Sequence, residues 1–304
     1  MPSFASTLTI AIAMEGRYAY YPNDEYYDTK QRAYFSAIRV PDAWRKLQGL
    51  KRSFRTIAII DSGMESTHPD LEANAVVGTT RHGTKVAGIA GAVINNKIGI
   101  AGLTDYVKLM PIYDGGLETD EATSASIEYA VNSHVDVILY TAGQPAPFGA
   151  KSVAALKKAS EAGIPFVCAA GNNNQNISKP EHIRYPCEYT KTVDVVICVA
   201  ATTEDTMDLL YTSNYAPFID VAALGDTYTT YVGRDYGSCS GTSGAAAFIA
   251  GVIAMMKSVS QEALDGQRIK SIIKETSTPG VNRGGFPMVF GRVDVLSAVE
   301  RVIA

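Results

Sequence analysis

Six short, continuous apolar runs alternate along the chain with longer helical patterns, and this alternation restricts the fold more than any other feature. The runs are rich in β-branched residues and lie at Thr56–Ile60, Lys108–Tyr113, Val135–Leu139, Ile164–Ala169, Val193–Ala200 and Phe218–Ala222. The helical patterns lie at Gly83–Val93, Thr123–Asn132, Lys151–Ala162, Gly244–Ser258 and Gln267–Glu275. Strands that are apolar on both faces are typical of a parallel sheet under helices. We therefore predict one α/β domain with a mostly parallel sheet.

Composition limits the size of the protein and the class of its partners. The 304 residues, 46% of them hydrophobic, suffice for a sizeable core and exclude a disordered chain. A net charge of −4 without a basic block disfavours nucleic acid and anionic membrane surfaces as partners. The longest apolar run, Ser243 to Met256, is too short to cross a bilayer and is typical of a buried helix. We expect no membrane span.

The four cysteines and the first 50 residues are less informative. No C-x-x-C spacing suggests zinc, and buried free thiols are the simplest interpretation, although Cys187 and Cys198 flank a short loop and could pair. Residues 1–50 are tyrosine-rich, with one helical pattern near Val40–Leu47, and we interpret them as an extension that packs on a domain of residues 51–304. Met1–Met14 lacks a basic region and a cleavage site and so makes a poor signal peptide. We therefore expect a mature or truncated start, with a cytosolic protein as the alternative.

Four polar residues stand where a ligand site is expected, because open α/β sheets bind ligands beyond the carboxyl ends of their strands. Asp61 ends the first apolar run and Asn172 follows the fourth. His82 and Ser243 each begin a helical pattern. Together these residue types supply what acyl transfer needs: a nucleophile, a base, a carboxylate that orients the base, and a donor for the oxyanion. Singly, each is more simply a turn or cap residue.

The strings around these residues are more specific. They read IIDSG at 59–63, HGTKVAG at 82–88, AAGN at 169–172 and GTSGA at 241–245. Between and beyond them come HPDL at 68–71, NNKIG at 95–99, SNY at 213–215 and FGRVD at 290–294. With these strings the chain resembles the subtilisin-like serine proteases, the subtilases of peptidase family S8, from about Tyr34 to Ala304. The resemblance implies a three-layer α/β fold, with a mostly parallel central sheet flanked by helices, and a serine endopeptidase that works through an acyl-enzyme.

The resemblance also implies a role for each of the four residues. Asp61 would orient His82, which would take the proton of the nucleophile Ser243 and later give it to the leaving amine. Asn172 would donate its side-chain amide to the oxyanion, together with the backbone N–H of Ser243. The helix that begins at Ser243 favours negative charge at its N-terminus.

Substrate binding is implied for two segments, between which an extended peptide would add as a strand. One is Val137–Gly143 and the other is Tyr113–Gly116. The residues expected to contact substrate are Thr141, Ala142, Gly143, Gly171 and Gly115. Small residues at 142, 143 and 171 indicate an open pocket for a sizeable apolar side chain. We expect a monomer that acts on peptides or proteins.

Calcium in a structural role is the implied cofactor, because the family holds this cation in the loop after the histidine helix. The ligands carried over from the family are the carboxylate of Asp70, the side chain of Asn96 and the carbonyls of Ile94, Ile98 and Ile100. Oxygen-only ligation suits calcium. A polar loop without a metal is the alternative, and a further ligand near Asn23–Asp24 cannot be placed from the sequence.

Several positions depart from the family pattern, namely Lys85, Leu139, Gly244, Ala247 and the short spacing between Asp61 and His82. None removes a candidate catalytic residue, so the alternative of a weak, peptide-binding relative stays open but is not favoured. An α/β-hydrolase esterase is disfavoured because its acid and histidine follow the serine. No inhibitory propeptide is recognisable: it has been removed, it is missing from this chain, or this is an intracellular member. Otherwise the resemblance implies an extracellular protein or one of the secretory pathway.

Overall fold

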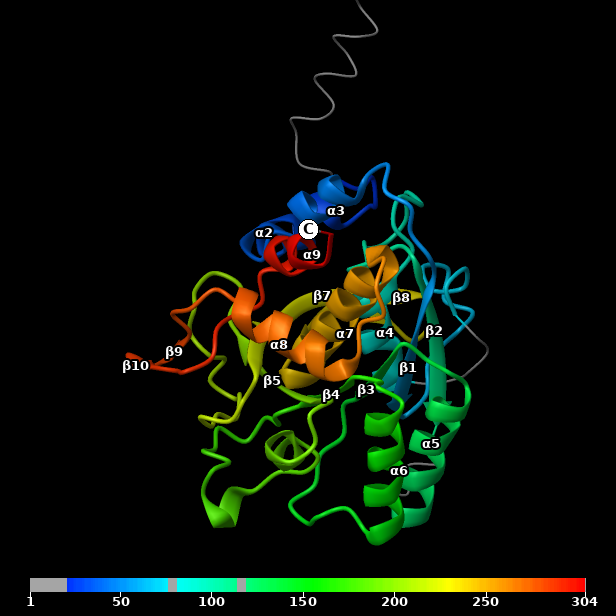
Figure 1. Ribbon diagram of the computed structural model, residues 1–304. Coiled ribbons are helices and arrows are strands. Elements are labelled where there is room, and N and C mark those ends of the chain that lie inside the picture. The colour runs from blue at the N-terminus through cyan, green and yellow to red at the C-terminus, as the bar shows by residue number, and fades with distance from the viewer. Residues whose placement is uncertain (1–20, 76–80, 114–118, 304) are drawn as a thin grey trace, which may run out of the picture.

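The computed structural model describes residues 21–75, 81–113 and 119–303, and it is built around a six-stranded sheet (Figure 1). All neighbouring strands of this sheet are parallel, in the order β2-β1-β3-β4-β5-β6. Their bounds are β1 Arg55–Asp61, β2 Val107–Tyr113, β3 Val137–Tyr140, β4 Phe166–Ala169, β5 Val196–Thr202 and β6 Val221–Leu224. The predicted α/β fold with a mostly parallel central sheet is confirmed.

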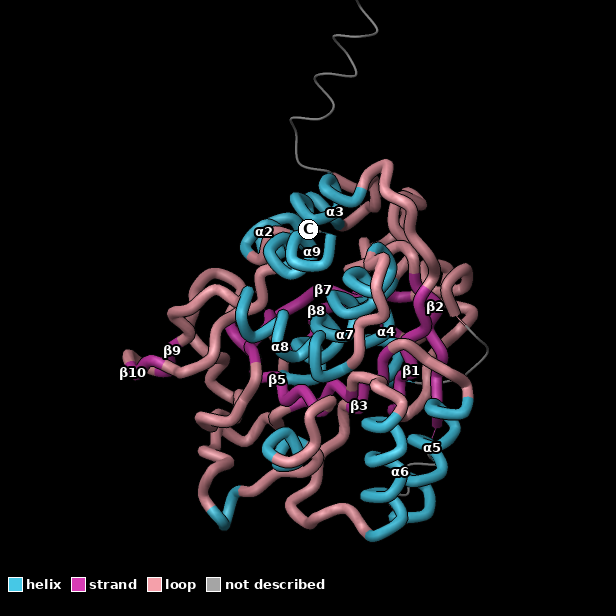
Figure 2. The backbone as a smooth tube through the Cα atoms, in the orientation of Figure 1, coloured by secondary structure: helices cyan, strands magenta, loops and turns pink. Residues whose placement is uncertain are grey.

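Helices cover both faces of the sheet and make the three layers (Figure 2). One face carries α4 (Arg81–Gly91), α7 (Thr242–Val259), α8 (Gly266–Thr276) and α9 (Val295–Ile303). The other face carries α5 (Asp120–Asn132) and α6 (Ala150–Glu161). Alternate residues of β1 enter the two hydrophobic clusters, Ile57 and Ile59 on one side and Ala58 and Ile60 on the other. This two-sided burial explains why the strand sequences are continuous apolar runs.

The described part of the N-terminal extension packs on the α7 side of the molecule. It contains the helical segments η1 (Tyr27–Gln31), α2 (Arg32–Ala37) and α3 (Val40–Leu47). The ring of Phe35 lies 5.9 Å from that of Phe248 in α7 and 5.5 Å from that of Trp44. The indole N–H of Trp44 donates to the carbonyl of Leu103 at 2.8 Å. These aromatic residues are buried, so residues 27–47 extend the same hydrophobic core.

An antiparallel hairpin of β7 (Asp226–Tyr231) and β8 (Asp235–Ser240) leads into α7, and the sequence analysis did not predict it. The hairpin lies along α4, where Thr229 and Thr230 donate to the carbonyls of Lys85 and Thr84, both at 2.7 Å. A second, shorter hairpin consists of β9 (Asn282–Arg283) and β10 (Phe286–Pro287). Two 3-10 turns complete the elements, η2 (Pro180–His182) and η3 (Cys187–Lys191).

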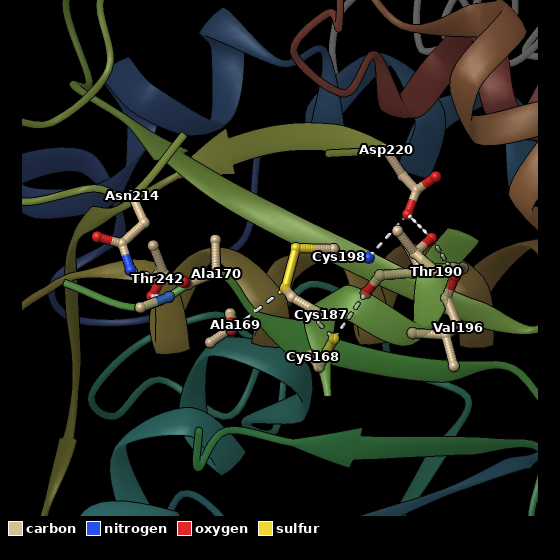
Figure 3. The surroundings of a disulfide bond; sticks show 12 residues. Cys168, Ala169, Ala170, Cys187, Thr190, Val196, Cys198, Asn214, Asp220 and Thr242 are labelled. Carbon is tan, nitrogen blue, oxygen red and sulfur yellow. Dashed lines mark hydrogen bonds between the residues drawn. A yellow bond between two sulfur atoms is a disulfide. The ribbon is translucent and has the colours of Figure 1, made fainter. Parts of the chain in front are cut away.

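Cys187 and Cys198 form a disulfide that joins η3 to β5 (Figure 3). The simpler expectation of free thiols is therefore wrong for these two cysteines, whose pairing the sequence left open. The free thiol of Cys168 in β4 lies 3.6 Å from the sulfur of Cys187. Burial raises the pKa of the Cys168 thiol. All three cysteines lie in the α5–α6 side of the core.

Helix α7 is apolar over 18 residues, enough by length and composition to cross a membrane, but 89% of that stretch is buried inside the protein. It is the central core helix on its side of the sheet. This burial agrees with the expected buried helix around Ser243 to Met256.

Candidate active site

Asp61 lies at the carboxyl end of β1, between β2 and β3, and only 4% of its side chain is exposed. Its carboxylate accepts hydrogen bonds from the backbone N–H of Ser62 at 2.6 Å and from the hydroxyls of Ser62 and Thr141. Its Oδ2 atom lies 2.7 Å from Nδ1 of His82. Burial alone would raise the pKa of Asp61, but the hydrogen bonds and the charge of His82 outweigh it, and the pKa is lowered. The carboxylate is therefore ionised beside the imidazole.

His82 lies in the first turn of α4 and is fixed by the end of β1. Its backbone N–H donates to the hydroxyl of Ser62 at 3.1 Å. The next residue must be small, because a Cβ at Gly83 would lie 2.1 Å from the carbonyl oxygen of Gly63. The imidazole remains 43% exposed. With Nδ1 on Asp61, the outer nitrogen, Nε2, is available to other groups.

Ser243 is the second residue of α7, one step after the helix begins at Thr242. The turn into the helix passes through Gly241 at φ 130°, a conformation that favours glycine. The first amides of a helix have no intrahelical partner, so they can bind a negatively charged oxygen. Helices α4 and α7 pack against each other on one face of the sheet. The elements that carry His82 and Ser243 are thus direct neighbours.

Asn172 follows β4, and its amide is oriented by the start of α7. Its Oδ1 atom accepts hydrogen bonds from the backbone N–H of Thr242 at 2.9 Å and from the Thr242 hydroxyl at 3.0 Å. That hydroxyl in turn accepts the backbone N–H of Gly171 at 3.0 Å. Because the oxygen of the Asn172 amide is held by Thr242, its NH₂ group is directed away from these contacts. Thr242 was not predicted as a functional residue from the sequence, although it lies within the GTSGA string.

Asn214 also holds the loop that carries Asn172, and its side chain lies beside Ala170 and Thr242 (Figure 3). This buried side chain donates to the carbonyl of Ala170 at 2.8 Å and accepts the backbone N–H groups of Asn173 at 3.1 Å and Gln175 at 3.0 Å. The SNY string at 213–215 was noted in the sequence without a role. Here it fixes the backbone on both sides of Asn172.

The predicted substrate residues occupy adjacent strand ends. Thr141, Ala142 and Gly143 follow β3, and Gly171 follows its neighbour β4. The hydroxyl of Thr141 donates a hydrogen bond to the carboxylate of Asp61, so this side chain helps to hold Asp61 in place. Backbone hydrogen bonds of 2.8 and 3.0 Å pair Gln144 with Tyr185 and fix the segment after Gly143. Gly115 lies outside the described residues.

The model of the subtilase family matches residues 55–292, from the start of β1 into the C-terminal FGRVD string. The chain belongs to the subtilase family. It is a serine-type endopeptidase, and no candidate catalytic residue is missing from it.

Relatives of known activity cover most of this subtilase. Thermitase of Thermoactinomyces vulgaris is 32% identical over 298 residues, which are 92% of this chain and 100% of thermitase. The major intracellular serine protease of Bacillus subtilis (strain 168) is 30% identical over 247 residues, 74% of each chain. A solved protease of Pseudoalteromonas arctica PAMC 21717 superimposes with a TM-score of 0.77 at 25% identity, covering 92% of this chain and 99% of that one.

The departures of this subtilase from the family pattern are accommodated by packing. The ammonium of Lys85 lies 4.1 Å from the ring centre of Tyr231 in the β7–β8 hairpin. Gly244 faces Ile89, and Ala247 and Leu139 are fully buried in the core. None of these residues enters the contacts between Asp61 and His82 or between Asn172 and Thr242.

Two of the predicted calcium residues, Asn96 and Ile100, contact the buried carboxylate of Asp70 through N–H groups, and the buried Asp24 lies against the same loop. Asp70 accepts the side-chain N–H of Asn96 at 2.7 Å and the backbone N–H of Ile100 at 2.8 Å. Asp24 accepts the backbone N–H groups of Asn95 at 3.0 Å and Asn96 at 3.2 Å. The loop is thereby joined to the N-terminal extension, and Asp24 is the neighbour that the sequence could not place.

These carboxylates lack a cationic partner. Asp70 and Asp24 are 0% and 4% exposed, and neither forms an ion pair with lysine or arginine in the described part of the chain. Burial raises the pKa of Asp70 to about 7 and also raises that of Asp24. Buried carboxylates need a compensating positive charge, and a hard cation such as calcium would supply one.

Proposed function

We propose that Asp61, His82 and Ser243 are the catalytic triad of this endopeptidase and that Asn172 is its oxyanion donor. The observation that carries the proposal is the 2.7 Å hydrogen bond between His82 Nδ1 and a buried, ionised Asp61. It sets the tautomer of His82, with the proton on Nδ1, so that Nε2 can accept the proton of Ser243. The orientation of Asn172 by Thr242 supports the second role.

The reaction then follows from the four residues. As Ser243 Oγ attacks the scissile carbonyl, its proton moves to His82 Nε2, and Asp61 stabilises the imidazolium. The carbonyl oxygen becomes an oxyanion, which accepts hydrogen bonds from Asn172 Nδ2 and the backbone N–H of Ser243. His82 gives its proton to the leaving amine as the C–N bond breaks, and the acyl group stays on Ser243 as the acyl-enzyme. Water, deprotonated by His82, releases the acid product by the same steps.

Labelling by a peptidyl phosphonate tests this assignment. The phosphonate should bond covalently to the wild-type protein and not to Ser243→Ala. Ser240→Ala, a nearby substitution at the exposed end of β8, is the matched control and should be labelled normally. Failure of the wild type to react would favour the alternative, a subtilase-fold protein that binds peptides without cutting them.

We propose that peptide and protein substrates bind as an extended strand along residues 141–143, with Gly171 beside the scissile carbonyl and Gly115 on the facing segment. The position of 141–143 directly after β3, next to Asp61, supports this arrangement. A strand added there would gain main-chain hydrogen bonds.

We propose that calcium binds at Asp70, Asn96 and the carbonyls of Ile94, Ile98 and Ile100, with Asp24 as an additional ligand. Two buried carboxylates support the site, because neither pairs with a lysine or arginine among the residues that the structure describes. Rotation of the Asn96 amide by 180° would present its oxygen, in place of its NH₂ group, to Asp70. Isothermal titration with calcium should show binding that Asp70→Ala abolishes.

We propose further that the protein works outside the cell or in the secretory pathway, as a monomer, with residues 1–50 as an extension of a catalytic domain at 51–304. The Cys187–Cys198 disulfide supports an oxidising compartment. An inhibitory propeptide is a possible partner. Fractionation of the producing cells tests the location, because a protein confined to the cytosol would contradict it.

A further inference from the structure

Arg184 is a cationic residue that lies beside the proposed substrate site and that the sequence analysis did not single out. It precedes Tyr185, which pairs with Gln144, so the arginine lies next to the segment that carries Gly143. Its Nη2 atom donates to the carbonyl of Gly143 at 3.0 Å. One wall of the substrate segment is thus in direct contact with a guanidinium.

The Arg184 guanidinium has N–H groups beyond the one that donates to Gly143. Its Nε atom is buried and has no hydrogen-bond partner in the structure. Among residues 21–75, 81–113 and 119–303, no carboxylate lies within ion-pair distance of Arg184. A buried donor without an acceptor costs free energy, and a guanidinium has five N–H groups. A ligand that supplied an anionic acceptor would remove this cost.

Two glycines of the proposed substrate site lie directly beside the arginine. A Cβ at Gly143 would lie 3.9 Å from Arg184 Nη2, and a Cβ at Gly171 would lie 3.6 Å from Arg184 Nε. Gly171 is the residue before Asn172, the proposed oxyanion donor. The guanidinium therefore lies within the length of one side chain of the place where the scissile carbonyl would be held.

We propose that Arg184 binds the carboxylate of the substrate residue that contributes the scissile carbonyl, so that this endopeptidase cleaves preferentially after glutamate or aspartate. The proposal rests on the proposed function and names its substrate class. It replaces the apolar side chain expected from the small residues 142, 143 and 171. Charge-assisted, two-pronged hydrogen bonding to a carboxylate is what a guanidinium does best.

Four peptides that differ only at this position, with glutamate, glutamine, leucine or lysine, test the preference. The wild type should cleave the glutamate peptide with a kcat/KM about 10- to 100-fold above the glutamine peptide, the range expected for a hydrogen bond to a charged group. Arg184→Gln should abolish that ratio by slowing cleavage of the glutamate peptide far more than cleavage of the leucine peptide. Arg184→Glu should shift the preference to lysine.

Arg283→Gln is the matched control, because Arg283 stacks on Tyr215 at 4.2 Å and its loss removes the same charge without touching residues 143 or 171. The glutamate preference should survive it. If Arg184 only braces the Gly143 carbonyl, Arg184→Gln will slow all four peptides equally, and the proposal is overturned. It also falls if the wild type shows no preference for the glutamate peptide.

Binding measurements separate this proposal from the catalytic one. Product peptides that end in glutamate or glutamine are titrated into Ser243→Ala, where no turnover is needed. Tighter binding of the glutamate peptide, lost in Ser243→Ala/Arg184→Gln, supports the role of Arg184 even if the wild type cleaves nothing. Equal binding of the two peptides contradicts it even if the triad is correct.

Discussion

At the scale of single residues, Ser243 and His82 should behave as one unit. Ser243→Ala removes the nucleophile and should lower kcat by about 10⁶-fold without unfolding the protein. Adding His82→Ala should cost little more, because a base without a nucleophile has no proton to take. Steady-state kinetics of both single variants and the double variant measure this. Losses that multiplied in full would contradict the shared role.

Asn172 should act mainly on the transition state. Asn172→Leu removes the NH₂ donor and should lower kcat about 10²- to 10³-fold with little change in KM. Asn173→Leu, one residue further along the same exposed loop, is the control and should leave kcat nearly unchanged. An effect of Asn172→Leu on KM alone would make it a substrate-binding residue.

The lowered pKa of Asp61 predicts a pH dependence of stability. The unfolded carboxyl has a pKa of about 3.9, and the folded one lies below it, so the unfolded state binds more protons between these two values. The contribution of Asp61 is present above the unfolded pKa and is lost as pH falls through the folded pKa. The free energy of unfolding is measured with urea at a series of acid pH values in a Ser243→Ala background, which prevents autolysis. It should fall less steeply with decreasing pH when Asp61→Asn is added. An unchanged pH dependence would contradict the prediction.

At the scale of elements, the disulfide between η3 and β5 should stabilise the fold. Cys187→Ala/Cys198→Ala should lower the free energy of unfolding by about 2–3 kcal/mol, because the 11-residue separation is no longer closed in the unfolded chain. Both cysteines are replaced together since Cys168, 3.6 Å from Cys187, could otherwise form a new disulfide. Cys239→Ala is the control with a free thiol. Equal unfolding midpoints for the two variants would contradict the prediction.

Elements could be predicted from the sequence where they belong to the central sheet, whose strands are buried on both faces, or to the helices that pack against it. All six strands of the central sheet and the five helices α4 to α8 were located, with ends shifted by up to three residues, because their apolar patterns report the core. The β7–β8 hairpin was missed because its strands are polar and depend on contacts such as Thr229 to Lys85, 144 residues apart. The Cys187–Cys198 bond was undecidable because it depends on a Cα separation of 5.0 Å that no spacing reveals.

The same limit applied within the site. The triad positions could be named from local strings, whereas Thr242 and Arg184 acquire meaning only from contacts across the chain. Thr242 orients an asparagine 70 residues earlier, and Arg184 touches a carbonyl 41 residues earlier. Local motifs therefore predict which residues could react, and the fold shows which contacts orient them.

At the scale of the whole molecule, calcium should connect the N-terminal extension to the catalytic domain. Asp24 contacts the 94–100 loop, so a cation shared with Asp70 would bind only the folded state and add about 2.7 kcal/mol at 100 times Kd. In the Ser243→Ala background, chelation should lower Tm by roughly 5–10 °C and expose the extension to added trypsin. Asp70→Ala should remove most of this calcium response, whereas Asp28→Ala, an exposed carboxylate of the same extension, should keep it. If chelators leave the midpoint unmoved, the metal site is wrong, while the assignment of Asp61, His82 and Ser243 is unaffected, because none of them contacts that loop.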